Sequence, residues 1–151
     1  MIETSNSVHV DAPVSDVFAY MDRPENQPEI TPSLTRSEIL EERADGSKRV
    51  AYGYGLGGIT MDGELDAVEY EPEERVVWEM TGDLSGEITW EFEPEDDGTR
   101  VTYAASYDVP GGVLEKLAAP FVKRYNGREV ETTLENLKTR VEHDATAEAT
   151  D

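Results

Sequence analysis

Between residues 34 and 108, bulky apolar residues alternate with polar or small ones in six successive stretches. An alternation with a period of two is typical of a β-strand that has one buried and one exposed face. Val50, Tyr52 and Tyr54, for example, are separated by single small residues. Turn signals rich in Gly, Pro and Asp lie between the stretches, without an intervening helix pattern. The pattern therefore predicts an antiparallel meander of six strands.

The residues before this meander predict one more strand and a short helical region. Residues 2–11 alternate around Val8 and Val10, and Pro13 then fits the first turn of a helix. Because residues 23–33 contain three prolines, we expect a loop there with at most one helical turn.

One long helix pattern, over residues 113–142, follows the meander. We expect this helix to cover the apolar face of the sheet, because no other segment is available to do so. The predicted fold is α+β, with a curved seven-stranded antiparallel sheet wrapped around a long C-terminal helix. It forms one domain over residues 1–143, followed by a disordered acidic tail over residues 144–151. The apolar stripe of the helix consists of Val130, Leu134, Leu137 and Val141.

Composition and charge exclude several classes of protein. The 151 residues include no cysteine, which excludes disulfides and thiolate chemistry, and no run of 18 apolar residues that would predict a membrane span. The first residues lack the features of a signal peptide, so we expect a cytoplasmic protein. The formal net charge of −21 makes nucleic acid a poor partner. Salt screens repulsion between such charges, so the acidity favours a halophilic protein.

Two segments resemble the START-like or SRPBCC superfamily of helix-grip proteins. They are VHVDAPVSDVFAYMDRPENQPEITPS near the start and VETTLENLKTRVE near the end, and the resemblance covers roughly residues 2–143. It implies a cavity between the sheet and the C-terminal helix. Members include polyketide cyclase/dehydratase-like and lipid-transfer proteins, most of which bind hydrophobic small molecules while a minority catalyse reactions on them.

The sequence contains no pattern that predicts a catalytic, metal or cofactor site. Neither His9 nor His143 has a nearby partner that would suggest general base catalysis, so surface roles are the preferred interpretation. Asp62, Glu64 and Asp66 lie on the polar face of a predicted strand and lack the spacing of a calcium loop. In so acidic a chain, a solvated face is the simpler interpretation.

The apolar face of the predicted sheet is rich in aromatic residues. Buried Tyr and Trp side chains need hydrogen-bond partners, which a pocket holding water or ligand can supply. For each of these residues the sequence leaves core packing and ligand contact open. The candidate ligand-binding residues of the sheet are Tyr52, Tyr54, Met61, Trp78, Trp90, Tyr103 and Tyr107.

The first half of the long helix supplies two further candidates. If the helix is continuous, the apolar stripe extends backwards to small and polar residues, which leaves room beneath the helix and places Lys123 and Asn126 at the cavity. Lys123 could then anchor an anionic group of the ligand. Alternatively, Pro120 and Gly127 break the helix and change which residues face the sheet.

These observations favour non-covalent binding or transport of a hydrophobic or amphipathic small molecule, without a cofactor. One alternative is an enzyme of the cyclase or dehydratase type that uses tyrosine hydroxyls. Another is a protein-interaction module that acts on a chaperone or ribosome. The identity of the ligand and the oligomeric state are left open by the sequence.

Overall fold

The computed structural model describes residues 2–56, 58–109, 111 and 119–150; for Leu56, residues 119–123, Asn126 and residues 144–150 it describes the backbone only. The elements in chain order are β1 (Ile2–Val10), α1 (Val14–Met21), the 3-10 helix η1 (Pro24–Asn26), α2 (Gln27–Ile30), β2 (Leu34–Glu42), β3 (Lys48–Leu56), β4 (Ile59–Glu71), β5 (Arg75–Gly82), β6 (Ser85–Glu95), β7 (Gly98–Asp108) and α4 (Ala119–Thr150).

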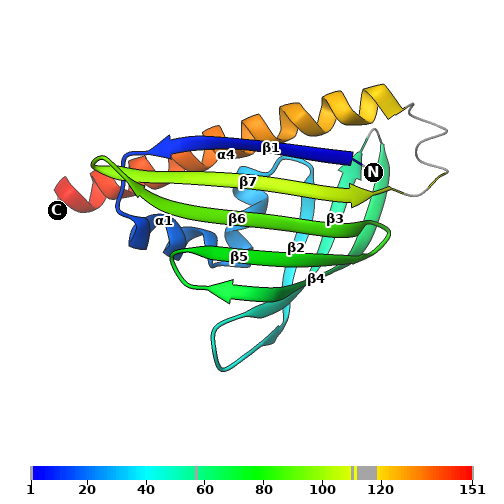
Figure 1. The fold of residues 1–151 in the computed structure, drawn as a ribbon, viewed down its shortest axis with the longest axis horizontal. Coiled ribbons are helices and arrows are strands. Elements are labelled where there is room, and N and C mark those ends of the chain that lie inside the picture. The colour runs from blue at the N-terminus through cyan, green and yellow to red at the C-terminus, as the bar shows by residue number, and fades with distance from the viewer. Residues whose placement is uncertain (1, 57, 110, 112–118, 151) are drawn as a thin grey trace.

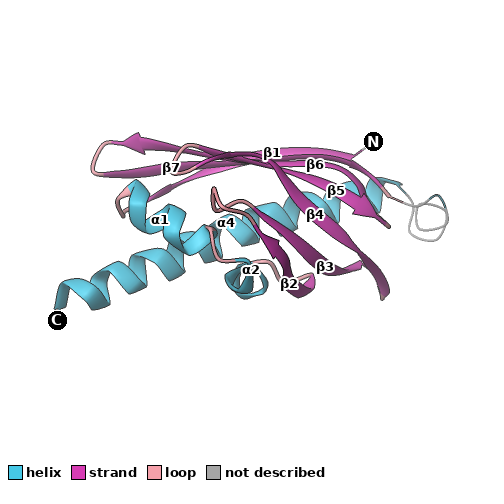
Figure 2. Ribbon diagram, turned by 90° about the horizontal axis from the view of Figure 1, so that it is seen from below, coloured by secondary structure: helices cyan, strands magenta, loops and turns pink. Residues whose placement is uncertain are grey.

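The seven strands form one antiparallel sheet in the order β1-β7-β6-β5-β4-β3-β2. Figure 1 shows the sheet curving, so that β2 and β3 run at a steep angle to β6 and β7. The helices α1, α2 and α4 lie on one side of the sheet, the side towards which β2 and β3 turn (Figure 2). This arrangement confirms the predicted α+β helix-grip fold.

Helix α4 packs on the sheet through the predicted stripe. Val130, Leu134, Leu137 and Val141 are all buried, in one core cluster with residues of α1, β6 and β7. The helix is continuous from Ala119 through Gly127, so neither Pro120 nor Gly127 interrupts it.

The predicted limits of this helix differ from the structure in one respect. It extends beyond residue 142 to Thr150. The predicted start at residue 113 lies outside the described residues. The expected disorder of residues 144–151 stays a prediction.

The loop expected over residues 23–33 is more helical than predicted. It contains η1 and, directly after it, α2. Pro24 and Pro28 occupy the first positions of these two helices, where the fixed backbone angle of proline favours a helix start instead of breaking one. The two short helices bring Pro24, Gln27 and Ile30 over the open face of the sheet.

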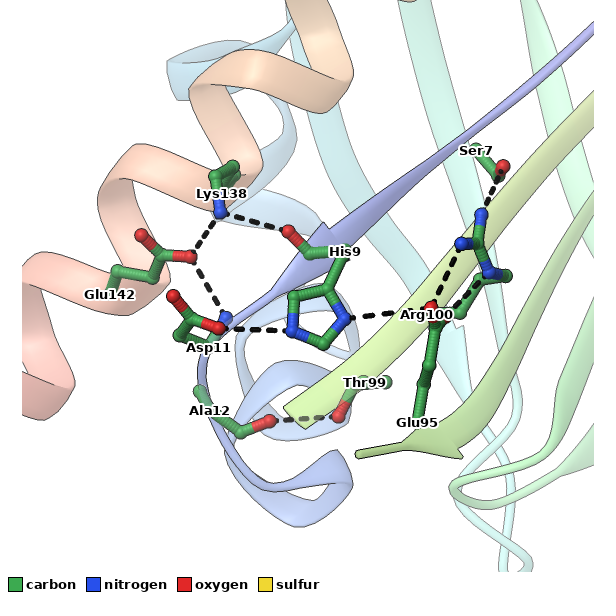
Figure 3. A network of polar contacts seen from close by, with 9 residues as sticks. All are labelled: Ser7, His9, Asp11, Ala12, Glu95, Thr99, Arg100, Lys138 and Glu142. Carbon is green, nitrogen blue, oxygen red and sulfur yellow. Dashed lines mark hydrogen bonds and ion pairs between the residues drawn. The ribbon is translucent and has the colours of Figure 1, made fainter. Parts of the chain in front are cut away.

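Polar contacts join α4 to the edge strand β1 (Figure 3). Lys138 Nζ donates to the carbonyl of His9 at 2.9 Å and lies 2.6 Å from the carboxylate of Glu142. The same carboxylate accepts the N–H of Asp11 at 2.8 Å. On the outer side of the sheet, the ring of His9 lies 2.9 Å from the Asp11 carboxylate. These contacts fix the angle at which α4 crosses the sheet.

A second polar group joins the end of α1 to strands β3 and β4. Lys48 is buried, and its ammonium donates to the carbonyl of Gly46 at 2.9 Å and lies 3.5 Å from Asp22. Tyr70 donates its hydroxyl hydrogen to the same carboxylate at 2.8 Å. A buried ammonium requires such partners, so this group holds α1 at a defined distance from β3 and β4.

Candidate functional site

A cavity of about 120 Å³ lies between the sheet, the α2 region and α4. The buried apolar residues form two clusters, and the cavity wall includes members of both: Trp90 and Val130 belong to one, and Tyr52 and Met80 to the other. The void therefore borders both clusters, which are joined by Ile88 and Tyr103. Engineered apolar cavities of about 150 Å³ bind benzene, so this void has the size of a small aromatic ring.

Helix α4 contributes part of the cavity wall. Among the described side chains of α4, the fully buried apolar stripe runs from Val130 to Val141, and Tyr125 packs against the second core cluster before it. One turn before Val130 the helix has Gly127, where an added Cβ would meet no atom within 4 Å. From α4, the cavity is lined by Glu129, Val130 and Thr133. The expectation of room beneath the first half of the helix stays a prediction, because the side chains of residues 119–123 and of Asn126 lie outside the described residues.

All six aromatic candidates on the sheet come together around this cavity. Both tryptophans lie in its wall, on the neighbouring strands β5 and β6. Trp90 also packs edge-on against Tyr103, with ring centroids 4.7 Å apart. The candidates that line the cavity are Tyr52, Tyr54, Trp78, Trp90, Tyr103 and Tyr107.

Three other candidates do not contribute to the described wall. Met61 is buried in the same core cluster as Tyr52 and Met80, but it does not line the cavity. The side chains of Lys123 and Asn126 lie outside the described residues. A role for Lys123 at the cavity therefore stays a prediction.

The tyrosines of the wall are of two kinds, which differ in whether the hydroxyl makes a hydrogen bond within the described part of the chain. Tyr52 is of the first kind, because its hydroxyl does. Its hydroxyl accepts the N–H of Leu84 at 3.1 Å and lies 3.3 Å from the carbonyl of Thr81, to which it donates. Gly63 makes this possible, because a Cβ there would lie 2.6 Å from the Tyr52 hydroxyl oxygen. The polar atom of Tyr52 is thus used to hold the β5–β6 turn, and only its ring faces the cavity.

Tyr54, Tyr103 and Tyr107 are of the second kind. Within the described part of the chain, their hydroxyls make no hydrogen bond. Burial, followed by the charge of Glu129, raises the pKa of Tyr103, and the same two causes contribute for Tyr54 and Tyr107. All three remain neutral phenols over the physiological range and can donate or accept a hydrogen bond at the cavity.

Glu129 is the acidic residue in the described cavity wall, and the sequence did not reveal it. It lies half-buried on α4, and one carboxylate oxygen accepts the N–H of Ser33 at 2.8 Å. The hydroxyl of Ser33 in turn hydrogen-bonds to Tyr125. In a chain with 34 acidic residues, one glutamate carries no signal of its own. Its position one residue before Val130, at the start of the apolar stripe, is the only sequence feature that could have identified it.

The polar residues that were interpreted as surface occupy the surface. Among Asp62, Glu64 and Asp66, the last two make ion pairs with Arg49 and Arg43. The described residues contain no group of three or more acidic or histidine side chains that could hold a metal ion. No described helix is long and apolar enough to cross a membrane.

Known proteins resemble this chain in both sequence and fold. Residues 1–142 match the family described as polyketide cyclase / dehydrase and lipid transport. A crystal structure of a protein from Thermus thermophilus is 25% identical, with a TM-score of 0.75 over 92% of this chain and 96% of that one. No curated protein matches the chain.

Two more distant structures share the fold alone. A START superfamily protein from Mycobacterium smegmatis is 20% identical, with a TM-score of 0.72 over 93% of this chain and 97% of that one. An aromatase/cyclase from Streptomyces sp. R1128 is 16% identical, with a TM-score of 0.73 over 95% and 94% of the two chains. Because the family match covers nearly the whole chain, the protein belongs to the polyketide cyclase / dehydrase and lipid transport family.

Proposed function

We propose that the protein binds a small hydrophobic or amphipathic molecule in the cavity between the sheet and α4. The observation that supports this most is the unfilled space itself, which is bordered by both core clusters. Close packing is the rule in protein interiors, and an unfilled void forfeits dispersion contacts. A ligand of suitable shape would restore those contacts.

The tryptophans provide a direct readout for this proposal. The chain has two, Trp78 and Trp90, and both line the cavity. A ligand that enters should therefore change the intrinsic fluorescence. Toluene is a suitable probe, because it is apolar and close to the cavity in size. Titration of toluene, followed by tryptophan emission and by saturation-transfer NMR, gives a dissociation constant.

Two adjacent threonines offer a matched pair of variants. Thr133 is buried and lines the cavity, whereas Thr132 is exposed on the outer side of α4. Thr133→Phe places a ring in the void and should weaken toluene binding by about tenfold or more, while Thr132→Phe should leave it unchanged. If Thr133→Phe does not fold, Thr133→Met fills the void with a more adaptable side chain. Equal toluene binding by the wild type and a folded Thr133 variant would refute the proposal.

A second candidate function is catalysis of the cyclase or dehydratase type. The observation in its favour is Glu129, an ionisable group that shares the cavity with the phenols of Tyr54, Tyr103 and Tyr107. A carboxylate and hydroxyl donors are the groups that proton transfer next to a carbonyl requires. Mass spectrometry of ligand recovered after incubation distinguishes the two functions, because binding alone returns the molecule unchanged.

The acidic surface supports a further proposal, that the protein works in concentrated salt. Asp and Glu outnumber Lys and Arg by 34 to 13. The self-repulsion of such a surface is largely screened at molar salt concentration. A cytoplasmic location stays a prediction.

A further inference from the structure

We propose that the cavity selects ligands whose polar group donates a hydrogen bond, an alcohol or an ammonium group, and rejects carboxylates. This inference rests on the proposed binding function and adds the chemistry of the ligand's polar end. It rests on four of the polar residues that share the wall with the apolar ones: Glu129, Tyr54, Tyr103 and Tyr107.

Glu129 provides the first step of the argument. The Ser33 N–H occupies one of its carboxylate oxygens, and a carboxylate can accept several hydrogen bonds. Because the side chain is half-buried at the wall of an otherwise apolar cavity, its charge is screened less than a surface charge. The remaining acceptor capacity therefore favours a donor on the ligand.

The three tyrosines provide the second step. Their hydroxyls make no hydrogen bond within the described part of the chain, although they lie in the wall of the same cavity. A phenol that donates to Glu129 or to a ligand oxygen can also accept from the ligand. A ligand hydroxyl could therefore donate to Glu129 while it accepts from Tyr54, Tyr103 or Tyr107. An apolar ligand would make none of these hydrogen bonds, so its binding would lack their favourable free energy.

An anionic ligand would meet the opposite situation. A carboxylate beside Glu129 would place two like charges in a partly desolvated cavity, which is unfavourable. The described wall offers no Lys or Arg side chain to compensate. The side chain that could do so, Lys123, lies outside the described residues, and the experiment has to distinguish its contribution.

Four probes that share a benzene ring test the inference: toluene, benzyl alcohol, benzylamine in its ammonium form, and benzoate. Dissociation constants are measured at neutral pH in molar KCl, where attraction of cations to the acidic surface is screened. We expect benzyl alcohol and benzylammonium to bind about tenfold or more tightly than benzoate, since a charge-assisted hydrogen bond contributes at least that much.

Substitutions then test whether the preference for hydrogen-bond donors arises from residues of the cavity. Glu129→Gln retains an oxygen that can accept the Ser33 N–H, and it should weaken benzylammonium binding about tenfold while changing toluene binding little. Glu131→Gln is the matched control, because Glu131 is exposed on the same helix and the net charge changes equally. Tyr107→Phe should weaken benzyl alcohol binding and spare toluene.

Each result has a definite meaning. Benzoate binding as tightly as the alcohol and the ammonium would overturn the inference while leaving the binding function intact, provided toluene binds. A preference for benzoate that Lys123→Met abolishes would also overturn it, in favour of an anionic ligand anchored by Lys123. If none of the four probes binds, the proposed function fails and the inference fails with it.

Discussion

The substitution Tyr52→Phe tests whether the hydroxyl of Tyr52 supports the fold, in contrast to the tyrosine hydroxyls that we propose to face a ligand. Tyr52 is 3% exposed, and its hydroxyl accepts the Leu84 N–H at 3.1 Å. Phenylalanine keeps the ring but leaves this buried donor without an acceptor. An unsatisfied buried donor costs about 1–3 kcal/mol. For a chain of this length, each kcal/mol corresponds to about 2–4 °C, so the melting temperature should fall by about 2–12 °C.

Tyr103→Phe is the control for this prediction. It removes a hydroxyl that makes no hydrogen bond within the described part of the chain, so the free energy of unfolding should change by less than about 0.5 kcal/mol. Urea unfolding at a fixed KCl concentration, followed by tryptophan fluorescence, measures both variants. Equal destabilisation by the two substitutions would refute the distinction between the two kinds of tyrosine.

Three further predictions concern charge, pH and helix α4. Because salt screens the repulsion within a chain of charge −21, the thermal midpoint should rise as KCl increases to molar concentration; a flat or falling midpoint would contradict this. Burial raises the pKa of Tyr54, Tyr103 and Tyr107, so stability should be fully present below about pH 10 and should then fall by up to about 1.4 kcal/mol per pH unit for each tyrosine. Ionisation of these tyrosines in the folded protein near pH 10, seen as tyrosinate absorbance before unfolding, would argue against it. Gly127→Ala should stabilise the protein by about 0.5–1 kcal/mol in urea unfolding, because the added methyl group meets open space and alanine favours a helix; a loss of stability would mean that Gly127 is needed for close approach.

The sequence predicted the sheet well because its alternation has a period that only a strand can use. The inward rows, such as Val101, Tyr103, Ala105 and Tyr107, lie on the face that the helices cover. The stripe of α4 was predicted for the same reason, since its spacing is helical. Periodicity thus identified which side chains face inwards, and six of the candidate residues line the cavity as a result.

The same reasoning missed features that depend on position instead of period. Pro24 and Pro28 were interpreted as helix breakers, although proline at the first positions of η1 and α2 favours both helices. Glu129 was missed because an acidic residue carries little information in a chain this acidic. Tyr52 could not be distinguished from Tyr103, since the partner of its hydroxyl lies in a turn about 30 residues away, near Leu84. The size of the cavity depends on how side chains from several strands and helices pack together, which no local pattern records.

The location of bound toluene tests the account most directly. Nuclear Overhauser effects between the ligand and assigned protein protons identify the residues that it contacts. The account predicts contacts with the rings of Trp78, Trp90 and Tyr103, which line the cavity. Contacts confined to exposed apolar residues such as Ile39 and Val68, without any to the two tryptophans, would contradict it.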